Sequence, residues 1–371
     1  QFLSKKKSIT LFMETNLTDF TLLIPTYNRH DHLTRLLQYI NNKNVNFKIL
    51  ILDSSNDESF IKNRELVKKI NPDWIINKYK HSISFKEKLL NGLKSVDTNY
   101  CAFCADDDIV IPDAIYQCVG FLKKNNDYVG SHGYYFTFSF DSYGYDCIVD
   151  DILYDADSIQ DDDPLTRMQT LFKDYQSNFY AVYSTDVQRR AFELAVKQES
   201  PLYFELFQSA YTAIDGKIKR LPIIYAGRQR APSADFPLKW HPAEWFSADP
   251  VDYRLNYQKY KEELLNVITN KIAASPANRE RKDIETILDL IHYHYTFSAN
   301  NLSAMEYAIY AHIDRQPSEV IVQKAFEYFV NNADSSLRSR LKKKMMNYSL
   351  VMAILNIDII RLIVKKVYYY I

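Results

Sequence analysis

Three consecutive aspartates, Asp106, Asp107 and Asp108, follow an apolar segment that carries no charge. Adjacent carboxylates repel one another, so holding them together costs free energy unless a cation neutralises them. Carboxylate oxygens suit Mg²⁺ and Mn²⁺, and such a site keeps coordination positions for diphosphate oxygens. The alternative is a solvated turn that caps the next helix. A second triplet, at 161–163, has no strand before it, and we interpret it as a loop.

Asp53 also closes an apolar segment, and small polar residues follow it. A carboxylate at this position can accept a hydrogen bond from a base N–H or from a ribose hydroxyl. The alternative is a helix-capping loop served by Asp57 with Ser54 or Ser55. Taken by itself, the capping loop is the simpler interpretation.

The segments around these aspartates alternate between two periodicities. Short apolar runs predict strands at 21–25, 47–52, 74–79, 100–105 and about 128–138. Helical spacing predicts helices at 31–43, 57–70, from 84 onward and from 112 to about 124. Ser84 and Glu87 form a capping box, and Pro112 suits a first helical turn.

Strand–helix alternation of this kind predicts a mostly parallel sheet covered by helices. Ligands bind such sheets beyond the carboxyl ends of the strands. Three polar clusters fall at three predicted strand ends, at 25–29, 53–57 and 106–108. We therefore expect them to converge in one crevice. Lys86 and Lys88, which precede the acidic strand, are expected only to solvate their helix.

Composition excludes several other sites. The 371 residues contain 7 glycines, and neither a Walker P-loop nor a GxGxxG loop is present. Basic and acidic residues number 46 each, so net charge does not favour nucleic acid. Cys101 and Cys104 form a CxxC, but residues three apart in a strand point to opposite faces. We interpret all 4 cysteines as thiols of a cytoplasmic protein without a signal peptide.

The motifs LLIPTYNRHDHLTRLL, ILDSSND and CADDDIVIPDAI resemble glycosyltransferase family 2 of the bacterial surface-polysaccharide type, across about residues 19–140. The resemblance implies the GT-A fold, a Rossmann-like α/β sheet flanked by helices. It also implies inverting transfer of a sugar from a nucleotide-diphosphate donor to the hydroxyl of a saccharide or lipid-linked saccharide, with Mn²⁺ or Mg²⁺ as cofactor.

The resemblance assigns roles at the strand ends. The segment that lines the nucleotide site falls on Pro25, Thr26, Tyr27 and Arg29. The aspartate that contacts the base falls on Asp53.

In the acidic motif, counting back from Pro112 places the principal metal ligand at Asp107 and leaves Asp108 to share the metal. Asp106 takes a ribose or metal contact, because Ala105 stands where the family commonly has an aspartate.

The second half is expected to hold the acceptor and the catalytic base. The segment ESPLYFELFQSAYTAIDGKIKRLPIIYAGRQR resembles the acceptor region of the family, and Glu205 is the candidate base, with Glu199 behind it. The alternative for Glu205 is a surface helix residue. Arg228 and Arg230 are candidates to grip the diphosphate. His241 is a candidate metal ligand, against the alternative of a packed or exposed histidine.

We expect a GT-A domain over 1–240, with a nucleotide-binding half at about 19–140 and an acceptor half at about 141–240. The stretch 231–250 predicts a loop or lid at the domain boundary. A helical C-terminal domain is expected over 250–371, with helices at 253–270, 279–298, 304–315 and 319–332.

The last apolar run, 350–371, follows a basic segment. It suits a helix on the inner membrane surface, a core helix or a dimer seam.

Two other functions share some of these features. A nucleotidyltransferase has a similar sheet and carboxylate pair, but normally has a glycine-rich phosphate loop, which IPTYNR is not. A catalytically silent GT-A scaffold or sugar-binding partner is the second alternative. Metal-dependent nucleotide binding would separate an enzyme from such a scaffold.

Overall fold

The computed structural model describes residues 17–140, 147–154, 156–230, 238–272, 279–298 and 301–302. The strands are β1 (Phe20–Thr26), β2 (Lys48–Asp53), β3 (Ile75–Lys78), β4 (Tyr100–Phe103), β5 (Ile109–Val110), β6 (Tyr128–Phe140), β7 (Cys147–Tyr154), β8 (Val182–Ser184) and β9 (Lys217–Gln229). The helices are α1 (His30–Asn41), α2 (Asp57–Ile70), α3 (Phe85–Lys94), α4 (Pro112–Leu122), α5 (Pro164–Lys173), α6 (Thr185–Ala195), α7 (Pro201–Asp215), α8 (Pro242–Ala248), α9 (Pro250–Ile272) and α10 (Arg281–Thr296).

The strands form one sheet in the order β3-β2-β1-β4-β8-β6-β9-β5, with β7 paired to β6. The predicted α/β fold is confirmed, and β3, β2, β1 and β4 run parallel as expected. The remainder is mixed, because β8 runs antiparallel to β4 and to β6, whereas β6 and β9 are parallel. The prediction of a mostly parallel sheet therefore holds for β3, β2, β1 and β4, whereas the rest of the sheet mixes parallel and antiparallel pairs.

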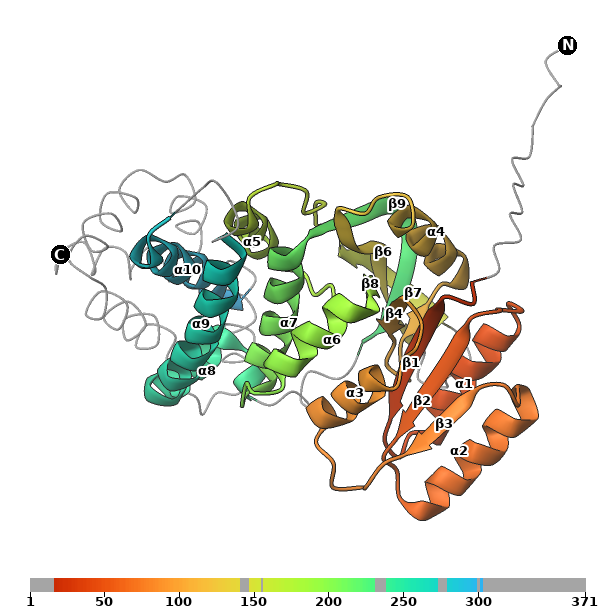
Figure 1. The fold of residues 1–371 in the computed structure, drawn as a ribbon. Helices are drawn as coiled ribbons and strands as arrows, with labels where there is room; N and C mark the ends of the chain where they lie inside the picture. The colour runs from red at the N-terminus through yellow and green to blue at the C-terminus, as the bar shows by residue number, and fades with distance from the viewer. Residues whose placement is uncertain are drawn as a thin grey trace, which may run out of the picture.

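The local sequence explains why the strands and helices next to the polar strand ends form. Every residue of β1 is buried, as its unbroken apolar run predicts. Figure 1 shows α1 and α2 on one side of the parallel strands and α3 on the other. The capping box of Ser84 and Glu87 opens α3 as predicted. At α2 the capping residue is Asn56, whose side chain accepts a hydrogen bond from the backbone of Ser59, so the prediction of Asp57 as cap is wrong.

The hydrophobic core continues from the sheet into the C-terminal helices. Trp245, Phe246 and Tyr295 belong to the same buried cluster as β1. Helix α9 packs on α7 and α10 packs on α5, and Figure 1 shows this helical group on the opposite side of the molecule from α1 and α2. The domain boundary near residue 240 stays a prediction. The prediction of a loop over 231–250 is wrong for the part that forms α8, a helix in which Trp245 and Phe246 are buried.

The predicted helices at 304–315 and 319–332 and the apolar run 350–371 lie outside the described residues. Across the ranges that are described, no helix is both long enough and apolar enough to cross a membrane.

Arg167 ties the loop at 161–163 to the end of α7. It is 4% exposed. Its guanidinium donates to the carbonyl oxygens of Ala213 and Ile214 at the end of α7, and to those of Asp161 and Asp162 before α5. The second aspartate triplet is therefore a loop, as interpreted, and its last residue caps α5.

We predict that Arg167→Met lowers the free energy of unfolding by about 3 kcal/mol, because it leaves buried carbonyls without donors. Chemical denaturation measures this change. Lys62→Met is the control, since Lys62 is 57% exposed in a surface pair with Glu58 and should leave the free energy of unfolding nearly unchanged. Equal losses for both variants would contradict the structural role of Arg167.

Candidate active site

The acidic turn after β4 lies against the end of β1. Asp106 is 3% exposed, and its Oδ2 accepts a hydrogen bond from Oγ1 of Thr26 at 2.7 Å. Arg29 donates to Oδ1 of Asp106 at 3.4 Å and to Oδ2 of Asp107 at 2.5 Å. Burial raises the pKa of Asp106 above its usual value, and the hydrogen bond from Thr26 opposes that shift. These four predicted site residues are thus brought together.

Asp108 points away from its two neighbours. Its Oδ1 accepts from the backbone N–H of Gln229 at 2.8 Å, and its Oδ2 accepts from the hydroxyl of Tyr180 at 2.6 Å. Nε of Arg228 lies 3.6 Å from the same Oδ2. Asp108 therefore joins the acidic turn to β9. This differs from its predicted share in a metal site, because both carboxylate oxygens are already used inside the protein.

Asp53 ends β2 directly beside Thr26, its partner in the parallel register. It is fully buried. Its Oδ1 accepts from the backbone N–H of Ser55 at 2.7 Å, and its Oδ2 accepts from the side-chain amide of Asn63 at 2.8 Å. The carboxylate thus holds the loop that joins β2 to α2. Its contact with a nucleotide base stays a prediction.

Lys88 is a site residue that sequence reasoning missed. It is 3% exposed, and its ammonium donates to the carbonyl of Thr26 at 2.9 Å and to Oγ of Ser54 at 2.8 Å. Burial lowers the pKa of Lys88 to about 8, while the charges of Asp53 and Asp106 oppose that shift. Lys88 lies four residues before Gly92, on the buried face of α3. This helical spacing is the signal in the sequence that could have identified it.

Lys86 also does more than solvate α3. It lines the cavity described below, and its ammonium donates to the carbonyl of Gln198 before α7. The expectation that Lys86 and Lys88 serve only as solvating residues is therefore wrong for both.

Tyr27 and His81 form a stacked pair at the same edge of the sheet. Their ring centroids are 4.8 Å apart with an interplanar angle of 15°, and the Tyr27 hydroxyl lies 2.9 Å from Nε2 of His81. Nδ1 of His81 lies 3.3 Å from the carbonyl oxygen of Ser54. Tyr27 is 47% exposed, so part of its ring surface is open to a ligand. No local pattern in the sequence marks His81, because tertiary folding brings its loop beside Tyr27.

A cavity of about 450 Å³ opens beyond the ends of β1 and β4. This volume is within the usual range for small-molecule sites. Pro25 and Ala105 line it at the strand ends, and aromatic side chains that include Phe179, Phe204 and Trp240 also line it.

Both candidate bases line this cavity, and they differ in charge environment. Oε1 of Glu205, in the second turn of α7, accepts a hydrogen bond from the hydroxyl of Tyr175 at 3.1 Å. Within the described ranges, no cation lies at ion-pair distance from Glu205. Glu199 instead pairs with Lys259 of α9 and is 67% exposed. The environment favours Glu205, whose charge is not already neutralised.

The two predicted diphosphate contacts also differ. Arg228 lines the cavity, and its guanidinium lies over the ring of Tyr180, 5.5 Å from the centroid. Arg230 is exposed just beyond the end of β9, where its backbone N–H donates to the carbonyl of Phe138. Only Arg228 is thus placed at the cavity.

His241 immediately precedes α8. In the part of the chain that the structure describes, no three His, Cys, Asp or Glu side chains form a group able to hold a metal ion. Neither His241 nor Asp108 belongs to such a group within the described ranges, and their roles as metal ligands stay predictions. Asp106 and Asp107 remain as adjacent carboxylates.

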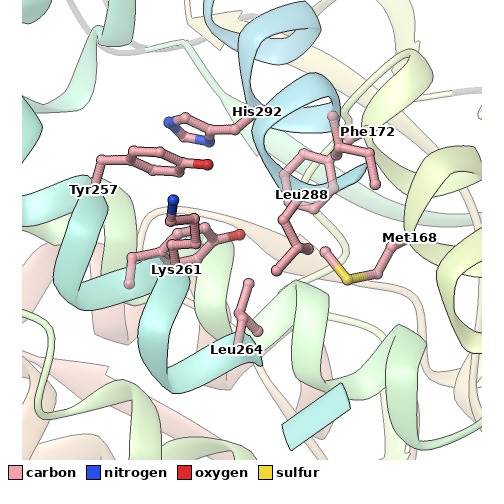
Figure 2. Close-up of a pocket in the computed structure, with 9 residues that line it drawn as sticks. Met168, Phe172, Tyr257, Lys261, Leu264, Leu288 and His292 are labelled. Atoms are coloured by element: carbon pink, nitrogen blue, oxygen red, sulfur yellow. The ribbon is translucent and has the colours of Figure 1, made fainter. Parts of the chain in front are cut away.

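A second, much smaller cavity of about 10 Å³ lies between α5, α9 and α10. Figure 2 shows the rings of Tyr257 and His292 facing each other, with the ammonium of Lys261 on the other side of the tyrosine ring. The two rings stack at 4.1 Å with an interplanar angle of 9°. Such a space holds about one water molecule, so we interpret it as a packing gap.

A comparison with protein families matches the part of the chain that contains these strand-end residues. The sequence model of glycosyl transferase family 2 matches residues 21–218. No curated protein matches in sequence. The match to the crystal structure of S. aureus TarS has 14% sequence identity and a TM-score of 0.47. It covers 86% of this chain and 50% of the TarS chain. This chain thus spans about half the length of TarS. The match to the complex of S. aureus TarS 1–349 with UDP-GlcNAc has 13% sequence identity and a TM-score of 0.49. It covers 84% of this chain and 81% of the TarS 1–349 chain.

We predict that Asp107 and Asp108 differ in their contribution to stability. Asp108→Ala should lower the free energy of unfolding by about 2 kcal/mol or more, because it leaves the buried hydroxyl of Tyr180 and the half-buried backbone N–H of Gln229 without an acceptor. Asp107→Ala should change it by under about 0.5 kcal/mol, since its partner Arg29 is 51% exposed. Urea denaturation of both variants measures the difference, and the reverse order would contradict these assignments.

We predict a pH signature for Lys88. Its pKa is about 8 in the folded protein, below the ordinary 10.5. Between these values the unfolded chain binds more protons, so this residue makes the free energy of unfolding rise with pH. The difference between the native protein and Lys88→Met should grow by at most about 1.4 kcal/mol per pH unit from about pH 8 upward. Denaturation at several pH values measures it, and a pH-independent difference would refute the burial of a titrating ammonium.

Proposed function

The chain belongs to glycosyl transferase family 2, and on that premise we propose that it is an inverting, metal-dependent glycosyltransferase. It moves a sugar from a nucleoside-diphosphate donor to an acceptor hydroxyl. The observation that carries the proposal is one juxtaposition. The carboxylates of Asp106 and Asp107 lie at the end of β4, and a cavity at the same strand ends has Glu205 in its wall.

Asp106 and Asp107 fit a Mn²⁺ or Mg²⁺ ion. Protein sites for Mg²⁺ commonly supply one or two carboxylates and leave the other positions to water and substrate phosphates. One carboxylate oxygen of each side chain pairs with the guanidinium of Arg29. Arg29 is half-exposed, so its side chain can rotate away when an ion binds. When bound, the ion supplies positive charge that offsets the charge of the diphosphate leaving group.

The nucleotide is proposed to lie along the edge formed by the ends of β1 and β2. The exposed ring of Tyr27, backed by His81, offers a surface on which a base can stack. Arg29 and Arg228 supply guanidinium groups suited to phosphate oxygens. Arg230 stays a weaker candidate, because it lies beyond the cavity lining.

The acceptor is proposed to enter from the side of α7. The aromatic walls give flat apolar surfaces on which the apolar face of a sugar ring can pack. The acceptor oxygen attacks the anomeric carbon opposite the diphosphate, forming the new C–O bond. The bond from that carbon to the diphosphate oxygen breaks, and its electron pair leaves with the nucleoside diphosphate. The carboxylate of Glu205 takes the hydroxyl proton, acting as general base.

We expect nucleoside diphosphate release from one member of a panel of nucleotide sugars that includes UDP-GlcNAc. Release should require Mn²⁺ or Mg²⁺ and should stop when a chelator is added. Calorimetry with the nucleotides, with and without Mn²⁺, is the parallel measurement. A silent scaffold would show neither turnover nor metal-dependent binding, and that result would overturn the proposal.

We predict that Glu205→Gln keeps donor binding within about twofold and slows transfer by about 100-fold or more, because it removes the general base but little of the shape. Transfer kinetics and donor calorimetry measure the two effects. Glu193→Gln is the matched control, an exposed residue of α6 outside the cavity lining. Unaltered transfer by Glu205→Gln would remove Glu205 from the mechanism.

A further inference from the structure

The carboxylate of Glu205 is held from behind the cavity wall. The hydroxyl of Tyr175 lies 3.1 Å from Oε1 of Glu205. Tyr175 stands in the segment between α5 and β8, whose Ser177 and Phe179 line the cavity. Tyr175 itself is outside the lining, but its hydroxyl contacts Glu205, which belongs to the lining.

The direction of this hydrogen bond follows from its chemistry. An ionised carboxylate has no proton to give, so the hydroxyl must be the donor. Burial, followed by the charge of Glu205, raises the pKa of Tyr175 well above its usual value, so the hydroxyl keeps its proton. Oε1 of Glu205 is therefore occupied, and among the described residues Oε2 makes no hydrogen bond. Oε2 is the oxygen left to receive a proton.

The ring of Tyr175 is fixed on two sides. It stacks on Phe172 of α5 at 5.4 Å with an interplanar angle of 16°. It also meets the edge of Tyr295 of α10 at 5.3 Å with an interplanar angle of 78°. Tyr295 is 6% exposed and belongs to the common core. The position of the hydroxyl therefore depends on a helix far along the chain from the nucleotide motifs.

We propose that Tyr175 is a positioning residue for the transfer reaction. It holds Oε1 of Glu205 so that Oε2 is presented to the acceptor hydroxyl, and α10 holds Tyr175 in turn. The inference rests on the proposed function. It assigns the C-terminal helices a part in catalysis, because without Tyr295 one side of the Tyr175 ring loses its support.

Tyr175→Phe tests this inference, because it removes only the hydroxyl. The expected result is a fall in kcat of about tenfold, with the donor KM within about twofold. The acid limb of the pH–kcat profile should move to higher pH, since a donated hydrogen bond favours the ionised carboxylate. In the Glu205→Gln background the same substitution should leave the residual rate within about twofold, because its effect passes through Glu205.

Tyr211→Phe is the matched control. Tyr211 lies on the same helix as Glu205 and is 8% exposed, and its hydroxyl accepts from Arg190 away from the cavity lining. It should leave both kcat and the pH profile unchanged. An unshifted acid limb for Tyr175→Phe, or an equal loss of rate in the Glu205→Gln background, would overturn the positioning role while the native enzyme stays active. Absence of transfer by the native protein would instead overturn the proposed function, and this inference with it.

Discussion

Buried charge at the ends of the parallel strands is the constraint on which the site depends. Asp53 and Asp106 lie almost fully out of water, on either side of Thr26, and the charge of Lys88 interacts with both. Unpaired charges in such a place cost several kcal/mol each. Hydrogen bonds from Thr26, Asn63 and the backbone, together with the lysine charge, offset that cost. The loops after β1 and β2 are consequently held by the same contacts that satisfy the carboxylates.

The acidic turn divides its three carboxylates between two tasks. Asp106 and Asp107 meet the half-exposed Arg29, whereas Asp108 is bound inside by Tyr180 and by the backbone of Gln229. Arg35 of α1 strengthens this attachment, because its guanidinium donates to the carbonyl of Asp107 and to the side chain of Gln229. The turn is thus fixed between α1 and β9. A fixed turn therefore holds the carboxylates of Asp106 and Asp107 beside Arg29.

The C-terminal helices are continuous with the hydrophobic core of the sheet. A shared core joins α9 and α10 to α5 and α7, and within it Tyr203 of α7 and Tyr253 of α9 lie 3.0 and 2.8 Å from Nε2 of His292. Burial lowers the pKa of His292 to about 3, so this ring stays neutral and can accept a hydrogen bond at neutral pH. The same helix α7 carries Glu205. Packing in the C-terminal helices is therefore mechanically connected to the wall of the cavity.

By itself, the sequence determined the alternating elements, the strand ends and the order of the motifs. Each depends on local signals, such as the apolar run of β1 and the capping box before α3. It could not determine that Asp108 turns inward, that Lys88 is buried or that His81 lies beside Tyr27. Those outcomes depend on partners distant in the chain, Gln229 for Asp108 and Thr26 for Lys88. Only the tertiary structure decided them, because which polar groups are shielded from water is a property of the packed chain and not of any single segment.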